Sequence, residues 1–488
     1  MIRIANGKLA ACLLLSAFTL AAEDAPHRLA ARAKGDTPLI TDLRELCDGI
    51  GGRPTGSPAC DRAIEWAAKK FRDIGIQNVS VEPYEAKSMW LPVSAEASAV
   101  SPASFPIRIA AAPMSPSTKG VLESRIIDAG EGTPEAFAKL GGTIRGAILL
   151  IHSSEMKSFD DLFAEYMRNA VLIDAVRKHQ PVALLLESTR PRGLLYRHPI
   201  SLDLNYGPVP TAVISREHAE RLARLAEKDA VRVRLSITNK TAPMYTSKNV
   251  IAEIRGREKP DEIVLIGAHL DSWDLGTGAE DNGVNAALVI DVARAFQDLG
   301  IVPRRTLRFA LFTGEEQGML GSEAYVARHK SELDKFAAVM IFDTGSGHLS
   351  GFYLNGRPEL RKPVNDALAV VEGLGADDQL PDVLDGTDNF DFLISGVPNL
   401  VGNQDPIPYL PDYHAESDTF DRVNQREEKT TEAVAAVLMW GLAENPERPA
   451  KRLTRPEVEK LVTETKLDEQ MKGFGQWDDF KKGKRGWQ

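Results

Sequence analysis

Regular alternation between apolar strands and amphipathic helices dominates the second half of this sequence, from residue 249 onward. Strands that are apolar throughout and alternate with helices are typical of a mostly parallel sheet with helices on both faces, so we predict an α/β fold. In such sheets, ligands bind beyond the carboxyl ends of the strands. The expected elements are strand 262–268, helix 284–299, strand 306–313, a helix from Ser322, strand 337–343 and a helix near 361–371.

The middle of the chain has a different character. Short β-like runs at 147–151, 182–186 and 231–237 are separated by Pro and Gly, which predicts an inserted β-rich domain. Helical spacing at 63–74 and alternation at 79–84 precede this insert. We divide the chain into a signal peptide (1–21), a main domain in two parts (22–87 and 244–446), the insert (88–243) and a C-terminal extension (447–488).

The amino-terminal residues resemble a secretory signal. Arg3 and Lys8 supply positive charge, residues 9–22 are almost wholly apolar, and small residues precede a cleavage site near Ala22. We therefore expect an exported protein, either periplasmic or secreted. No later stretch reaches the roughly 20 apolar residues that a membrane span needs, so no membrane contact is expected after the signal is removed.

Charge and cysteine content exclude some functions and leave others open. The chain has 69 acidic and 59 basic residues, and no basic groove is visible, so we do not expect a nucleic-acid partner. Beyond the signal segment, the cysteines are Cys47 and Cys60. They flank a Gly- and Pro-rich segment that could fold back on itself, which allows one disulfide in an oxidising compartment. Two buried free thiols are the equal alternative.

Polar side chains follow three of the predicted strands at the points where the strands end. His269 and Asp271 come after the first strand, Glu315 and Glu316 after the second, and Asp343 closes the third. Any one of these patterns is common in surface turns. Their joint placement is hard to explain structurally, because burying unpaired carboxylates together costs several kcal/mol without a cation.

Two loops add further candidates. Asp281 lies in a Gly-rich loop, 276–283, that leads into a helix, and Tyr413 and His414 lie in a loop after Pro411. Histidine nitrogen and carboxylate oxygen are suitable ligands for zinc. Two such ions, about 3.5–4 Å apart, can share a hydroxide and polarise a carbonyl at once. The residues at hand therefore predict a hydrolytic centre with one or two metals.

Four segments carry a resemblance to a known family. Residues 267–274, 312–318, 386–388 and 53–58 are similar to motifs of the co-catalytic zinc exopeptidases, which include aminopeptidase Y and plasma glutamate carboxypeptidase. The nearer likeness is to plasma glutamate carboxypeptidase. The resemblance covers about 48–445 and implies that the main domain is catalytic.

The resemblance implies a set of metal ligands. His269 and Asp343 would bind one ion, Glu316 and His414 would bind the other, and Asp281 would bridge both. The implied cofactor is two Zn²⁺ ions per chain, although another divalent metal would suit the same ligands.

The resemblance also implies roles for residues around the metals. Glu315 would be the general base, Asp271 would orient the metal ligand His269 without binding metal itself, and Tyr413 would stabilise the oxyanion. Asp388 would be a structural acid near the site, because an asparagine follows it where many relatives have a histidine.

The insert resembles a protease-associated domain, which would cover the cleft. Arg190, Arg192 and Arg197 cluster in one of its loops and are candidates to bind a substrate carboxylate, since guanidinium matches carboxylate in a bidentate manner. A solvated loop is the alternative.

In the C-terminal extension, the aromatic residues Phe474, Trp477 and Phe480 predict that the tail docks on the domain, and the basic residues 481–485 predict a solvated end.

We therefore expect an exported exopeptidase that acts on short peptides, most simply an aminopeptidase or dipeptidase. A carboxypeptidase of the glutamate carboxypeptidase type is the alternative, because selectivity for one end depends on pocket shape. A single-zinc glutaminyl cyclase and a non-catalytic, receptor-like relative are further readings. The sequence is compatible with a monomer or a homodimer.

Overall fold

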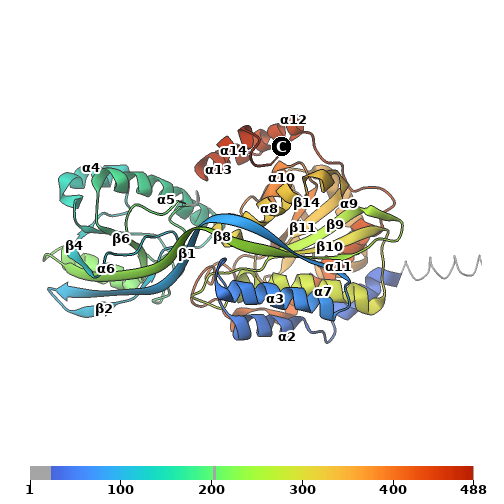
Figure 1. The fold of residues 1–488 in the computed structure, drawn as a ribbon, viewed down its shortest axis with the longest axis horizontal. Helices are drawn as coiled ribbons and strands as arrows, with labels where there is room; N and C mark the ends of the chain where they lie inside the picture. The colour runs from blue at the N-terminus through green and yellow to red at the C-terminus, as the bar shows by residue number, and fades with distance from the viewer. Residues whose placement is uncertain (1–23, 202–204, 487–488) are drawn as a thin grey trace, which may run out of the picture.

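The computed structural model describes residues 24–201 and 205–486, so the expected signal peptide at 1–21 lies outside the described residues. Two lobes are joined by a pair of very long antiparallel strands, β1 (Asn78–Ser101) and β8 (Arg232–Ile254) (Figure 1). Within the described ranges, no helix has the length and apolar character needed to cross a membrane.

The predicted main sheet is present and mostly parallel. At its centre, β9 (Lys259–His269) pairs in parallel with both β10 (Arg305–Phe312) and β11 (Phe336–Ile341), and β14 (Asn399–Gln404) pairs in parallel with β11. The register places Gly267 opposite Ala310 and Ile341. The outer strands on this side are β12 (Leu349–Tyr353), antiparallel to β14, and β13 (Asp378–Leu380).

Helices cover both faces of this sheet, as the continuous apolar strands predict. Val264, Ile266 and alternate residues of neighbouring strands pack with residues of α3 (Pro58–Asp73), α7 (Val284–Leu299) and α11 (Gln425–Glu444). Ile263, Leu265 and their counterparts pack on the other face with Tyr325 and Phe392. The further helices of this lobe are α2 (Leu39–Arg44), α8 (Leu320–Arg328), α9 (Arg361–Leu368) and α10 (Phe390–Ile394).

Local signals set the ends of two helices on the first face. Pro58 is the first residue of α3, and the Ser57 side chain accepts a hydrogen bond from the Cys60 amide at 3.1 Å, which satisfies one free donor. Gly300 ends α7 in the left-handed conformation that glycine adopts readily (φ 62°). The predicted span of α7 is confirmed at both ends.

The insert contains more helix than the sequence pattern predicts. Apart from the ends of β1 and β8 that extend into it, its described strands are short, and helices pack against them. The longest, α5 (Phe159–His179), begins at Ser158, whose side chain accepts from the Asp161 amide. The remaining elements are β2 (Phe105–Ile107), β3 (Ile109–Ala111), β4 (Leu122–Asp128), α4 (Pro134–Leu140), β5 (Ile148–Ile151), β6 (Ala183–Glu187), β7 (Thr211–Ile214) and α6 (Arg216–Ala226).

The C-terminal extension folds back onto the main lobe as three helices, α12 (Arg455–Glu464), α13 (Leu467–Gly473) and α14 (Trp477–Lys481), drawn in red in Figure 1. Phe480 is buried against α10, so the expected docking is confirmed. The expectation of a wholly solvated basic end is wrong, because Arg485 donates two hydrogen bonds to the buried Asp391.

Cys47 and Cys60 are both buried and unbonded, so the structure favours the thiol alternative. Burial raises the pKa of the Cys47 thiol to about 12 and also raises that of Cys60. Both thiols therefore stay protonated near neutral pH.

Candidate metal centre

Strand ends bring the candidate ligands to one edge of the sheet. His269 is the last residue of β9, Glu316 follows β10, and Asp343 lies two residues beyond β11. Asp281 comes from the loop before α7, and His414 comes from the loop between β14 and α11. This is the edge where parallel sheets bind their ligands.

The ligand atoms form two triads that share one carboxylate. His269 Nε2 lies 3.2 Å from Asp281 Oδ1 and 2.9 Å from Asp343 Oδ1. His414 Nε2 lies 2.7 Å from Glu316 Oε2 and 3.4 Å from Asp281 Oδ2. Within each triad, all ligand atoms lie within 4.8 Å of one another. The arrangement has the spacing of two neighbouring cation sites joined by Asp281.

The buried ligand atoms of these triads lack hydrogen-bond partners, and a bound cation would supply one. His269 Nε2, Asp281 Oδ2 and Asp343 Oδ1 have no partner in hydrogen-bond geometry, and neither oxygen of Glu316 has one. The ion-pair partners of these carboxylates are histidines; no lysine or arginine in the described ranges pairs with them. Buried carboxylates without compensation are costly, and a divalent cation would supply the missing charge.

The pKa shifts of the candidate ligands are also consistent with a cation site. Burial, and next the charge of Asp281, raise the pKa of the Glu316 carboxyl well above its usual value. Burial lowers the pKa of His414 to about 4, so its imidazole is neutral near pH 7, the form that binds a metal. Burial opposes protonation of His269, but Asp343 and the neighbouring carboxylates raise its pKa well above the usual value. A cation at Nε2 would displace that proton.

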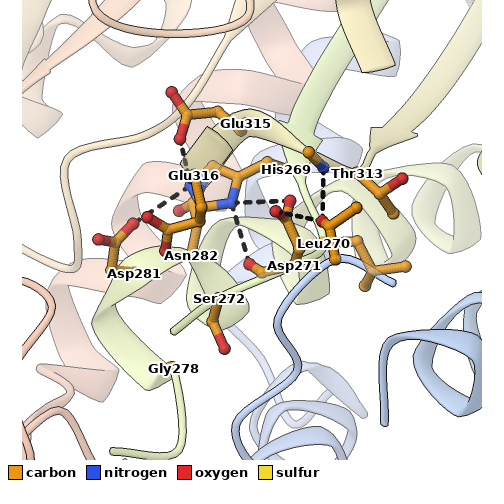
Figure 2. A network of polar contacts seen from close by, with 12 residues as sticks. His269, Leu270, Asp271, Ser272, Gly278, Asp281, Asn282, Thr313, Glu315 and Glu316 are labelled. Atoms are coloured by element: carbon orange, nitrogen blue, oxygen red, sulfur yellow. Dashed lines mark hydrogen bonds and ion pairs between the residues drawn. The ribbon is translucent and has the colours of Figure 1, made fainter. Parts of the chain in front are cut away.

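The backbone around Asp271 orients His269. His269 Nδ1 lies 3.0 Å from the Asp271 carbonyl oxygen and 3.6 Å from its carboxylate, so Nε2 points toward the other ligands (Figure 2). The Thr55 hydroxyl donates to Asp271 Oδ2 at 2.6 Å. Arg53 donates to the carbonyls of Leu270 and Gly278. The segment 53–58 therefore holds in place the loops that follow His269 and precede Asp281.

The insert holds the loop that carries His414. The Arg197 carbonyl lies 2.9 Å from His414 Nδ1, and the Arg197 amide donates to the His414 carbonyl. The guanidinium of Arg197 pairs with Asp274, and that of Arg190 donates to the Tyr413 carbonyl at 2.9 Å. Arg192 is exposed. None of the three is among the residues that line the cavity described below, so their role in substrate binding stays a prediction, while Arg190 and Arg197 make the structural contacts given above.

A cavity of about 680 Å³ opens beside the triads, and its lining includes Glu315, Glu316 and Asp343. This volume lies within the range of roughly 300–1,000 Å³ that is usual for small-molecule sites. Glu315 belongs to neither triad; its Oε2 lies 3.9 Å from His269 Nε2 (Figure 2). Burial, and next the charge of Asp343, raise the pKa of Glu315 well above its usual value.

The same cavity is lined by four tyrosines: Tyr166, Tyr353, Tyr409 and Tyr413. The Tyr413 hydroxyl lies 3.0 Å from the hydroxyl of Tyr166, which comes from α5 of the insert. Burial opposes ionisation of Asp281, but His269 and next His414 hold the pKa of its carboxyl below the usual value, and Tyr409 hydrogen-bonds the same carboxyl. Burial raises the pKa of Tyr413 well above 10, so its phenol remains a donor.

Asp388 lies behind this edge and is fully buried. Burial raises its pKa to about 8, so the carboxyl is mostly protonated near neutral pH. The adjacent Thr387 lines the cavity and hydrogen-bonds Asp343. Asp388 therefore lies close to the site without belonging to either triad.

Sequence reasoning missed several residues that shape the site. Asp418 accepts hydrogen bonds from the amides of Ala279, Glu280 and Asp281, which fixes the loop that carries the shared carboxylate. Tyr166 lies on α5, in a segment where the sequence pattern predicts short strands and no helix. The single sequence signal for Asp418 is its place four residues after His414.

Comparisons with known proteins relate this chain to peptidases. Residues 249–439 match the family model described as Peptidase family M28. Carboxypeptidase Q of Bos taurus is 28% identical over 407 residues, which cover 82% of this chain and 84% of that protein.

Solved structures share the fold. The crystal structure of a Peptidase M28 precursor from Shewanella amazonensis SB2B superimposes with a TM-score of 0.80 at 28% identity and covers 89% of this chain and 99% of that one. BSAP, a zinc aminopeptidase from Bacillus subtilis, has a TM-score of 0.66 at 19% identity and covers 86% of this chain and 97% of its own. The latter likeness concerns the fold alone.

Proposed function

Because this chain belongs to peptidase family M28 through residues 249–439 and is a peptide-bond hydrolase, we propose that it is an exported, zinc-dependent exopeptidase acting on short peptides. The observation that carries the proposal is the pair of candidate ligand triads that share Asp281 at the wall of the cavity. Export rests on the sequence at 1–21, and sequencing the amino terminus of the mature protein would test it.

His269, Asp281 and Asp343 would hold one zinc ion, and Asp281, Glu316 and His414 would hold a second. When bound, such a pair of ions acidifies a water molecule and polarises the scissile carbonyl. The unpaired buried ligand atoms support this assignment, because without a bound cation these atoms would have no partner.

Glu315 is the proposed general base. Its carboxylate faces the cavity and is free of both triads, so it can take a proton from the attacking water and pass it to the leaving amine. A raised carboxyl pKa suits this role, because proton transfer is most efficient when the pKa lies near the working pH. Tyr413, kept protonated by its environment, would donate to the oxygen on which negative charge develops.

The charges of the cavity favour recognition of a free amino end. Beyond the acids of the centre, its lining carries four more acids but only Lys87 and Arg485 as cations; the acids are Asp160, Glu323, Asp385 and Asp479. Arg485 is committed to Asp391. Carboxylates would attract an ammonium group, which supports an aminopeptidase or dipeptidase.

A carboxypeptidase is the second candidate, favoured by the similarity to Carboxypeptidase Q over 82% of the chain. Lys87 would then receive the free carboxylate, since it lines the cavity and no ion-pair partner for it is found in the described part of the chain.

One experiment separates these candidates. Zinc-loaded protein is assayed on a dipeptide with both ends free, with its amino end blocked and with its carboxyl end blocked. Rejection of only the amino-blocked substrate supports an aminopeptidase, and rejection of only the carboxyl-blocked one supports a carboxypeptidase. A dipeptidase rejects both. Chelation should abolish all cleavage and zinc should restore it; full activity in demetallated protein would contradict the proposal.

A further inference from the structure

The C-terminal extension contributes a wall to the same cavity that holds the candidate metal centre. Six of its residues line the cavity beside Glu315 and Tyr413: Gln470, Phe474, Gly475, Gln476, Asp479 and Arg485. In Figure 1, the red helices of this tail lie above the junction of the two lobes, near α5 of the insert. The cavity therefore has walls from three parts of the chain.

Buried contacts fix the base of the tail on the catalytic lobe. Phe480 and Met471 pack with Phe390 of α10 and with Met319, which lies three residues beyond Glu316. Arg485 donates to both oxygens of Asp391 at 2.9 and 2.8 Å, and Asp391 is only 1% exposed. Bidentate pairing of this kind defines position as well as charge. The tail is therefore held as an ordered part of the lobe.

The tip of the tail reaches across to the insert. The Phe474 ring meets Phe163 edge-on at 5.7 Å between centroids and Tyr166 at 6.2 Å. A side chain at Gly473 would come within 2.6 Å of the Met167 sulfur, so the tail backbone approaches α5 closely. Tyr166 in turn contacts the Tyr413 hydroxyl. All three of these aromatic side chains, Phe474, Phe163 and Tyr166, line the cavity.

From this arrangement, and resting on the proposed exopeptidase function, we propose that the tail sets the length of the substrate. Phe474, Phe163 and Tyr166, together called the aromatic gate below, form an apolar wall that accepts dipeptides and similarly short peptides. A longer peptide would need to pass between Phe474 and α5, where rings already touch. Phe474 is thus a specificity-determining residue and not a catalytic one.

The test compares Phe474→Ala with Trp477→Ala. Trp477 is a matched control, because it is an aromatic residue of the same tail that packs on Phe480 and does not line the cavity. kcat/KM is measured for a dipeptide and for a pentapeptide with the same scissile bond. We expect Phe474→Ala to raise the pentapeptide-to-dipeptide ratio by at least about tenfold, a size usual for changes in pocket contacts, and Trp477→Ala to leave it unchanged.

An unchanged ratio in Phe474→Ala, or an equal rise in both variants, would overturn the inference. A parent protein that cleaves neither peptide would contradict the proposed function instead. In that case, the contact between the tail and α5 is tested by hydrogen–deuterium exchange of the metal-free protein. Amides of residues 162–169 in α5 should exchange faster in Phe474→Ala than in the parent or in Trp477→Ala, and equal exchange in all three would show that the aromatic gate does not exist.

Discussion

Both lobes place polar residues at the carboxyl ends of parallel strands, but they balance the charges differently. In the insert, Asp128 ends β4, Glu187 ends β6 and His152 follows β5. His152 lies 2.7 Å from Glu187 and 3.1 Å from Asp128. Arg216 donates to Glu187 at 2.9 Å, so this cluster contains its own cation.

In the catalytic lobe, the corresponding edge has two histidines, three candidate ligand carboxylates and Glu315, and no guanidinium or ammonium group among the described residues pairs with any of them. Position at a strand end is therefore insufficient to mark a metal site. The discriminating feature is a deficit of positive charge around buried ligand atoms.

The largest expected effect separates Glu315 from Glu316, which are neighbours in the catalytic edge. Glu315→Gln should lower kcat by about 10²–10⁴-fold while both metals remain bound, because a positioned general base contributes about that much. Glu316→Gln should lose metal from the position shared with His414 and lose activity as a result. Metal content is measured beside kcat for each variant, and the reverse pattern would exchange the two assignments.

Neutral substitutions should change stability in opposite directions in the two lobes. In metal-free protein, the raised pKa of Glu316 means that folding disfavours its ionised form, so stability falls as pH rises above the unfolded pKa. Glu316→Gln should therefore raise the melting temperature of the metal-free protein at pH 7.

Arg216→Ala should instead lower the free energy of unfolding by about 1–3 kcal/mol, because it removes the guanidinium from Glu187, whose side chain is only 3% exposed. Denaturant melts of both metal-free variants would check the signs. A stabilising Arg216→Ala together with a destabilising Glu316→Gln would remove the distinction between the lobes.

The smallest expected effect concerns pH and the insert. Burial opposes protonation of His152, but Glu187 and Asp128 raise its pKa above 6.5. The ion pairs therefore stabilise the fold fully below the unfolded pKa, and this contribution is lost as pH rises through the higher folded value. Between pH 6 and 9, the parent should lose more stability than His152→Gln. Parallel pH profiles of the two proteins would contradict the assigned ion pairs.

Much of the fold and most of the candidate ligands were accessible from sequence. Long apolar strands and the helix at 284–299 have strong periodicity, and the strand-end rule indicates His269, Glu316 and Asp343 without any structure. The family resemblance carried by 267–274 is confirmed by the matched family model. The ligand roles themselves remain predictions until metal is measured.

The parts that sequence could not supply depend on contacts between distant segments. Arg197 is separated from His414 by 217 positions, and its carbonyl, which any residue has, makes the contact. Likewise, the sequence predicts that Arg485 is solvated, because nothing in it shows that Asp391, 94 positions earlier, is its partner. Charge alone does not show whether an arginine faces a substrate or a buried neighbour.

The central proposal is that one lobe would hold two cations through a shared Asp281, while the other lobe balances its charges with its own side chains. The most direct measurement is zinc stoichiometry by elemental analysis of the parent, Asp281→Ala and the insert variant Asp128→Ala. The account predicts two ions per chain in the parent and in Asp128→Ala, and reduced occupancy of both positions in Asp281→Ala. Two tightly held ions in Asp281→Ala, or loss of an ion in Asp128→Ala, would contradict it.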